Sequence, residues 1–119
     1  MEKTMSLGIQ TSCYSKVPPG LQAICISRGM PRGKQYKRYW PLAPGPWFKS
    51  VSEEEYRRRY FAQLNQLDVV DVLCDLYALT NQQRVILLCY EPPGQFCHRR
   101  LFAEWVESHC SGWVIPEME

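Results

Sequence analysis

The stretch Val85-Ile86-Leu87-Leu88-Cys89 decides the fold class, because it is an uninterrupted apolar run between polar and turn-forming neighbours. A short run of this kind is typical of a central strand that is covered on both faces, as in the parallel sheets of α/β proteins. The segment Glu91-Pro92-Pro93-Gly94 stops the strand, and a helical pattern follows over residues 98–109. We therefore predict an α/β fold with this strand at the centre of its sheet.

The chain has 119 residues, of which 45% are hydrophobic and 13% aromatic, so it can bury one core and is too short for two full domains. We treat residues 1–119 as one domain. The start Met1-Glu2-Lys3-Thr4 lacks the layout of a signal peptide, and no apolar run approaches the roughly 20 residues that span a bilayer. These features predict a cytoplasmic protein with no membrane partner, whose cysteines are reduced thiols.

Two further strands are expected before the central one, over residues 6–14 and 21–27. The connection between them, residues 15–20, is too short for a parallel crossover, so these strands are either antiparallel neighbours or not adjacent. A last short strand is expected over residues 113–115. The sequence thus predicts a small sheet that is mostly parallel or mixed.

Helices are expected to flank this sheet. Ser52-Glu53-Glu54-Glu55 has the spacing of a capping box, in which the serine accepts from a backbone amide and the last glutamate reaches back. The helix that it starts is expected to run to about residue 66. A second helical pattern begins near Val69 and ends at Asn81. The overall prediction is a single compact α/β domain.

The segment from Cys89 to Arg100 is the candidate site, because it joins the end of the central strand to the start of the last helix. In open α/β sheets, ligands bind beyond the carboxyl ends of the strands, where loops meet the amides and the dipole of the following helix. Cys97 stands directly before that helix, and the positive charge nearby favours its thiolate. We predict Cys97 as a nucleophile; the alternative is a cysteine that merely fills a capping position.

Two neighbours of Cys97 are candidates for proton transfer. His98 belongs to the apolar stripe of the last helix, so its ring is expected to face the sheet, near Tyr90 and Glu91. Its ordinary pKa of roughly 6.5 suits a general acid or base, although a histidine at a helix edge also serves as a packing residue. Glu91 is a second catalytic candidate, and its alternative role is an ion pair with Arg99.

Arg99 and Arg100 lie in the first turn of the expected helix, where their charge opposes the helix dipole. This placement favours an anionic partner, so we predict ligand-binding roles for both, with Arg99 favoured by its position. Tyr90, which leaves the strand end, is grouped with them.

Metal ions and common cofactors are not expected. Seven residues separate Cys89 from Cys97, and the chain has no Cys-x-x-Cys pair. A zinc site built from the cysteine and histidine pairs at residues 97–98 and 109–110 would need ligands about 16 Å apart, at the two ends of one helix. The chain also lacks a glycine-rich phosphate loop and a serine nucleophile elbow. We therefore predict no metal and no cofactor.

The basic residues are concentrated in the first half of the chain. Residues 4–52 carry seven basic side chains and no acidic one, whereas residues 53–119 carry six arginines and eleven acids. In the proline-rich loop 28–49, cations alternate with aromatic residues: Arg28, Arg32, Lys34, Lys37, Arg38 and Lys49 with Tyr36, Tyr39, Trp40, Trp47 and Phe48. Such a mixture is typical of nucleotide or single-strand recognition. The alternative is that the aromatic rings pack onto the core and the cations are only solvated.

Several short motifs occur in a combination that points to a known family. The main ones are Leu88-Cys89-Tyr90-Glu91, Phe96-Cys97-His98-Arg99-Arg100-Leu101, Ala103-Glu104-Trp105, Thr11-Ser12-Cys13-Tyr14, Ile26-Ser27-Arg28-Gly29 and Leu42-Ala43-Pro44. In these the chain resembles the domain-of-unknown-function 488 family over about residues 7–116, with Cys13 standing where a larger residue is expected. The resemblance implies a compact α/β protein with no established reaction. It directs attention to Arg28, Glu91, Cys97, His98 and Arg99.

Together these observations predict a pocket for an anionic ligand, in an enzyme that acts on a nucleotide or nucleic acid. The catalytic candidates are Cys97, His98 and Glu91, and the ligand-binding candidates are Arg28, Arg99, Tyr14, Tyr90 and Arg100. One alternative is a non-catalytic module that uses loop 28–49 to bind nucleic acid or a protein. Another is that the late motif is a structural knot, and the sequence alone does not decide between them.

Overall fold

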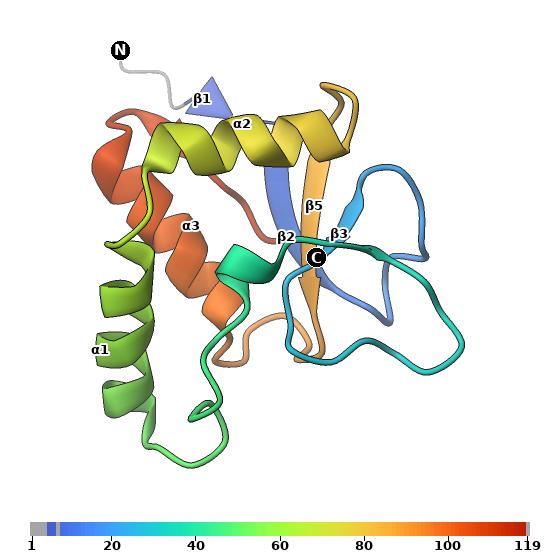
Figure 1. Cartoon of the computed structure of the whole chain (residues 1–119). Helices are drawn as coiled ribbons and strands as arrows, with labels where there is room; N and C mark the ends of the chain where they lie inside the picture. Colours follow the sequence, from blue (N-terminus) through green and yellow to red (C-terminus); the bar gives the residue numbers. More distant parts are fainter. Residues whose placement is uncertain (1–4, 7, 119) are drawn as a thin grey trace.

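A parallel sheet forms the centre of the protein in the computed structural model, which describes residues 5, 6 and 8–118 (Figure 1). Its strands are β2 (Ile9–Cys13), β3 (Ala23–Cys25), β4 (Lys37–Arg38) and β5 (Val85–Cys89), in the order β2-β5-β3-β4. The neighbouring strands pair in parallel. β5 therefore has a strand on each side, which confirms the central position predicted from its apolar run.

β2 and β3 are not neighbours, because β5 lies between them. Leu87 of β5 is in register with Thr11 of β2 on one side and with Ile24 of β3 on the other. Of the two arrangements that the short connection 15–20 allows, the non-adjacent one is correct. Within the described residues this sheet is parallel and not mixed.

The C-terminal segment returns to the outer side of β2. β6 (Trp113–Val114) pairs in parallel with β1 (Met5–Ser6), in agreement with the strand expected over residues 113–115. Beyond β6, the amide of Thr11 donates to the carbonyl of Pro116, and the amide of Met118 donates to the carbonyl of Thr11. Glu117, which lies between these two bonds, is thereby fixed beside β2.

The helices are α1 (Glu53–Leu64), α2 (Val69–Leu79) and α3 (His98–His109), close to the predicted bounds (Figure 1). Their buried side chains share one hydrophobic cluster with Ile9, Ile24 and Leu87 of the sheet, so all three lie on the same side of it, where α1 packs against α3. None of the described helices is long and apolar enough to cross a membrane.

The start of α1 follows the capping signal in the sequence. The side chain of Ser52 accepts from the amide of Glu55 at 3.2 Å, as predicted. The Glu55 carboxylate does not reach back; it pairs with Arg58 and Arg59 one turn further along the helix. The serine half of the capping box is therefore confirmed, while the glutamate half is replaced by ion pairs.

The opposite face of the sheet is covered by loop residues. Tyr14, Val17 and Tyr36 form a second hydrophobic cluster there with Cys25 and Leu88 of the strands. The segment over residues 29–50 contains only two short elements, β4 and a 3-10 turn, η1 (Trp40–Leu42). These short elements carry the chain back across the edge of the sheet before α1 begins.

Candidate functional site

A cleft with a volume of about 820 Å³ lies where the chain leaves β3 and β5 and enters α3. Because the two strands are parallel neighbours, their carboxyl ends reach the same edge of the sheet, and residues that follow them meet there. Arg28, Tyr90, Glu91, Cys97 and His98 all line this cleft. The part of the predicted site that follows directly from strand order is thus brought together.

His98 is buried at the floor of the cleft and faces the sheet, as its helical phase predicts. Its Nε2–H donates to the carbonyl of Ile26, at 2.7 Å, and its Nδ1 lies 3.7 Å from Sγ of Cys97. Burial, together with the positive charge of Arg99, lowers the pKa of His98 to about 4, against the opposing effect of the Ile26 hydrogen bond. The ring is therefore neutral at pH 7, with its unprotonated nitrogen towards the sulfur, and is not poised near working pH as we expected.

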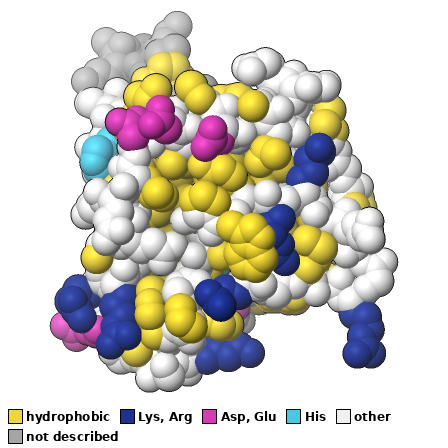
Figure 2. Space-filling model, in the orientation of Figure 1, with side chains coloured by type: hydrophobic (Ala, Val, Ile, Leu, Met, Phe, Trp, Pro, Cys, Tyr) yellow, Lys and Arg dark blue, Asp and Glu magenta, His cyan; other side chains and the backbone are white. Residues whose placement is uncertain are grey.

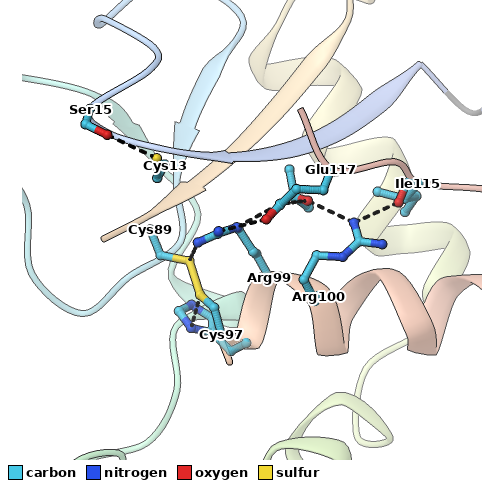
Figure 3. A network of polar contacts seen from close by, with 10 residues as sticks. Cys13, Ser15, Cys89, Cys97, Arg99, Arg100, Ile115 and Glu117 are labelled. Carbon is cyan, nitrogen blue, oxygen red and sulfur yellow. Dashed lines mark hydrogen bonds and ion pairs between the residues drawn. A yellow bond between two sulfur atoms is a disulfide. The ribbon is translucent and has the colours of Figure 1, made fainter. Parts of the chain in front are cut away.

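Cys97 forms a disulfide with Cys89 (Figure 3). This bond joins the last residue of β5 to the residue directly before α3. This corrects the expectation that both are free thiols. The intervening turn folds back, so two sulfurs that the sequence spacing separated meet at one point. Cys97 is only 4% exposed, and in this form its sulfur is bonded and is not a nucleophilic thiolate. Cys13, Cys25, Cys74 and Cys110 are free.

Arg99 points away from the cleft and is fully buried. Its Nε and Nη2 donate to the two carboxylate oxygens of Glu117, each at 2.9 Å, and its Nη1 donates to Sγ of Cys89 at 3.2 Å (Figure 3). Burial alone would raise the pKa of Glu117, but the hydrogen bonds from Arg99 and Thr11 hold that pKa below its usual range. The partner of Arg99 is therefore Glu117 and not Glu91, the partner that the sequence suggested.

Arg100 and Tyr14 also lie outside the cleft lining. Arg100 donates to Oγ1 of Thr11 and to the carbonyl of Ile115, so it ties α3 to the C-terminal segment (Figure 3). The Tyr14 hydroxyl is buried on the other face of the sheet, where it hydrogen-bonds Ser27 and donates to Sγ of Cys25. Its ring centroid lies 4.9 Å from that of Tyr90. Tyr14 thus supports a cleft residue without lining the cleft itself.

Four charged side chains that line the cleft have no ionic partner in the described part of the chain: Arg28, Lys49, Glu53 and Glu91. Arg28 donates from Nη1 to the carbonyl of Pro44 at 3.0 Å, and no carboxylate binds its guanidinium there. No hydrogen bond or ion pair among the described residues reaches the Glu91 carboxylate. Lys49 and Glu53 also line the cleft. The cleft therefore offers both positive and negative groups to a ligand.

Aromatic side chains form one wall of the cleft, and sequence reasoning missed two of them. The ring of Tyr56 from α1 meets that of Phe96 edge to face, with centroids 5.1 Å apart, and both line the cleft. Burial and the charge of Glu91 raise the pKa of Tyr56, so its phenol stays protonated. Tyr56 lies on the apolar stripe of α1, which in a sequence is indistinguishable from a core position, whereas Phe96 lies in the turn between β5 and α3.

Most aromatic side chains of loop 28–49 pack onto the protein. Tyr36 is buried, the Tyr39 hydroxyl donates to Asp75, and Trp47 contacts Tyr56 edge to face. Trp40 is the exception, because it is 57% exposed and the guanidinium of Arg38 lies 4.1 Å from its ring centroid. Figure 2 shows apolar side chains at the middle of this face, with most of the Lys and Arg side chains on its lower half.

These features define a class: a compact α/β domain with a parallel sheet and a cleft of ligand size at the carboxyl edge of its strands. The chain belongs to the DUF488-N3a family, described as the active DUF488-N3 subclade, whose profile matches residues 15–110. The resemblance inferred from the motifs is thereby confirmed, and the family is uncharacterised. Comparison with the curated proteins and with the solved structures gave no match. The matched residues include the whole β5 to α3 turn and end before Glu117.

Proposed function

We propose that the cleft binds a small ligand that carries both a phosphate and an aromatic ring, as nucleotides do. The observation that carries the proposal is the position of Arg28, whose guanidinium lines the cleft with no carboxylate partner among the described residues. An arginine fork matches the oxygens of a phosphate in a two-pronged contact. Lys49 provides a second cation on the same cleft.

The remaining walls fit the other half of such a ligand. Tyr56 and Phe96 offer apolar ring surface on which a base can pack. The cleft volume of about 820 Å³ falls within the roughly 300–1,000 Å³ that is usual for small-molecule sites. The Glu91 carboxylate is available to accept hydrogen bonds from the amino or ring N–H groups of a base.

The same cleft holds the catalytic candidates. Glu91 is the group best placed for proton transfer, because its carboxylate lines the cleft and is bound by no described residue. His98 contributes a neutral ring nitrogen, and Cys97 contributes a sulfur once the disulfide is reduced. The description of the family as an active subclade accords with catalysis on the bound ligand.

Binding is tested by calorimetric titration of the full chain with the four ribonucleoside monophosphates and with inorganic phosphate. We expect at least one nucleotide to bind more tightly than phosphate, since only the nucleotide also contacts the aromatic wall. Arg28→Gln should weaken that binding by about 10- to 100-fold, the loss expected for charge-assisted hydrogen bonds. Arg32→Gln is the matched control, because Arg32 is exposed and outside the cleft lining. Equal affinity of wild type and Arg28→Gln would contradict the proposal.

A second candidate function is favoured by the exposed Trp40 and the Arg38 guanidinium stacked on it. Such a pair is suited to stacking a base of a single strand. In that case an oligonucleotide binds more tightly than a mononucleotide, its affinity falls steeply as salt is raised, and Trp40→Ala weakens it. A mononucleotide site predicts instead that Trp40→Ala leaves affinity unchanged.

A further inference from the structure

Cys89, Cys97 and His98 bring three potential metal ligands together at the floor of the cleft. Their two sulfurs and a ring nitrogen of His98 all lie within 4.8 Å of one another, and all three residues line the cleft. We propose that reduction of the disulfide turns this cluster into a Zn²⁺ site with one coordination position open to the cleft. The spacing argument that disfavoured a metal in the sequence fails here, because the turn between β5 and α3 folds back.

The separations suit a tetrahedral ion. Zinc binds sulfur at about 2.3 Å and histidine nitrogen at about 2.0–2.1 Å, which places two ligand atoms of one tetrahedron about 3.5–3.8 Å apart. Nδ1 of His98 lies 3.7 Å from Sγ of Cys97, within that interval. Once the bond between the sulfurs is broken, the two sulfurs are free to move apart to the spacing of two zinc ligands.

The orientation of His98 is the one that a metal-bound histidine needs. Its Nε2–H is held by the carbonyl of Ile26 at 2.7 Å, which fixes the ring and leaves the lone pair of Nδ1 towards the sulfurs. Metal-bound histidines almost always donate their second ring nitrogen to a carbonyl or carboxylate in this way. The hydrogen bond that would orient a metal-bound His98 ring is thus already present in the fold.

The charges around the cluster also balance. Two thiolates compensate the charge of Zn²⁺, and the nearby Arg99 is compensated by Glu117. Arg99 donates to Sγ of Cys89 at 3.2 Å, a hydrogen bond that favours the thiolate form of this cysteine. A divalent cation therefore completes a neutral group at a buried position, which lowers the electrostatic penalty of burying the thiolates.

Three protein ligands and an open position are the arrangement of catalytic zinc sites, whereas structural sites use four protein ligands. The open position here faces the cleft that Glu91 also lines. In this state Cys97 is a ligand and not an attacking group. The inference goes beyond the proposed nucleotide binding, because Zn²⁺ binding is measured with no nucleotide present.

The redox step needs a reductant that the chain does not supply. A trialkylphosphine serves: it takes the oxygen of a water molecule and becomes the phosphine oxide, while the disulfide gains two electrons and two protons and becomes two thiols. Zn²⁺ then displaces the two thiol protons and binds both sulfurs. Reoxidation by a disulfide such as oxidised glutathione reverses the sequence by thiol–disulfide exchange and releases the ion.

The test titrates the phosphine-reduced full chain with Co²⁺ under anaerobic conditions, followed by competition with Zn²⁺. We expect one equivalent of Co²⁺ to bind, with a sulfur-to-cobalt charge-transfer band that Zn²⁺ abolishes. The unreduced wild type is the matched control, because it has the same sequence and fold but no free Cys89 or Cys97 thiol, and it should show no such band. A reduced protein without the band would overturn the proposal.

Variants identify the ligands. Cys97→Ser should remove most of the charge-transfer band, and His98→Ala should weaken Zn²⁺ binding by more than about 100-fold. Cys110→Ser is the control, since Cys110 lies at the opposite end of α3 and should leave both readings unchanged. An unchanged band in a folded Cys97→Ser protein overturns the proposal. If that variant does not fold, the comparison of reduced and unreduced wild type decides alone.

Discussion

Arg99 and Glu117 form a two-pronged, buried ion pair that fastens the start of α3 to the C-terminal segment. The Arg99 side chain is fully buried and that of Glu117 is 16% exposed. Because Arg99 also contacts Sγ of Cys89, the pair links the end of β5 to the segment beside β2. An arginine in the first turn of α3 is tolerated here because its charge is compensated by Glu117 on the side away from the cleft.

We expect Glu117→Gln to destabilise the protein by about 3 kcal/mol, because it leaves the buried guanidinium of Arg99 without a counter-charge. Chemical unfolding measures the change. Glu104→Gln is the matched control: the Arg57–Glu104 pair is 46% and 54% exposed, so its loss should cost less than about 1 kcal/mol. Equal effects of the two substitutions would show that burial of the Arg99 pair contributes nothing.

The same pair should make stability sensitive to acid. The pKa of Glu117 is lowered in the folded protein, so its stabilisation is present above the unfolded pKa of roughly 4.3 and is lost as pH falls through the folded value. The stability difference between wild type and Glu117→Gln should therefore be constant near neutral pH and shrink below about pH 4. His98 is present in both proteins, so its own titration cancels. A difference that does not shrink as pH falls below the unfolded pKa contradicts this assignment.

Reduction of the Cys89–Cys97 disulfide should lower the free energy of unfolding by about 2–3 kcal/mol in the absence of metal, the value expected for so short a loop. Chemical unfolding in the presence of a chelator, with and without a phosphine, measures this change in the free energy of unfolding. The double variant Cys89→Ala/Cys97→Ala should be insensitive to the phosphine. A wild type that is equally insensitive would contradict the pairing.

Alkylation should distinguish the cysteines by accessibility. In the unreduced protein, iodoacetamide should label the exposed Cys74 first and leave Cys97 unlabelled, since its sulfur is bonded. After reduction, Cys97 should become reactive because it lines the cleft, and Zn²⁺ should protect it. Peptide mass spectrometry measures the extent of alkylation at each cysteine. Labelling of Cys97 without reductant would be incompatible with the disulfide.

Elements with local signals could be predicted from the sequence. The apolar run of β5 and the helical stripes of α1 and α3 gave bounds close to the observed ones, because burial on a strand or a helix repeats within a few residues. The meeting of Arg28 with Glu91 and His98 follows from parallel strands that end at one edge. That part of the site can be predicted once the order of the strands is known.

The remaining contacts depend on the path of distant segments. Helical phase places Arg99 about 100° from His98, on the side of β2, but its partner Glu117 is set by the return of the C-terminal segment. The pairing of Cys89 with Cys97 depends on how the turn between them folds. No short-range pattern in the sequence carries either piece of information.

The strand order β2-β5-β3 has a consequence for how the chain acquires its structure. β2 and β3, the first strands of the four-stranded sheet to be synthesised, do not pair with each other, and β5, which lies between them, follows only after α1 and α2. Long-range pairing of this kind makes folding slow, because the whole intervening chain must be ordered before the contact forms. A fragment that stops before Val85 would expose two apolar strand edges without a partner, so nascent chains of this protein should be prone to aggregation until synthesis passes β5.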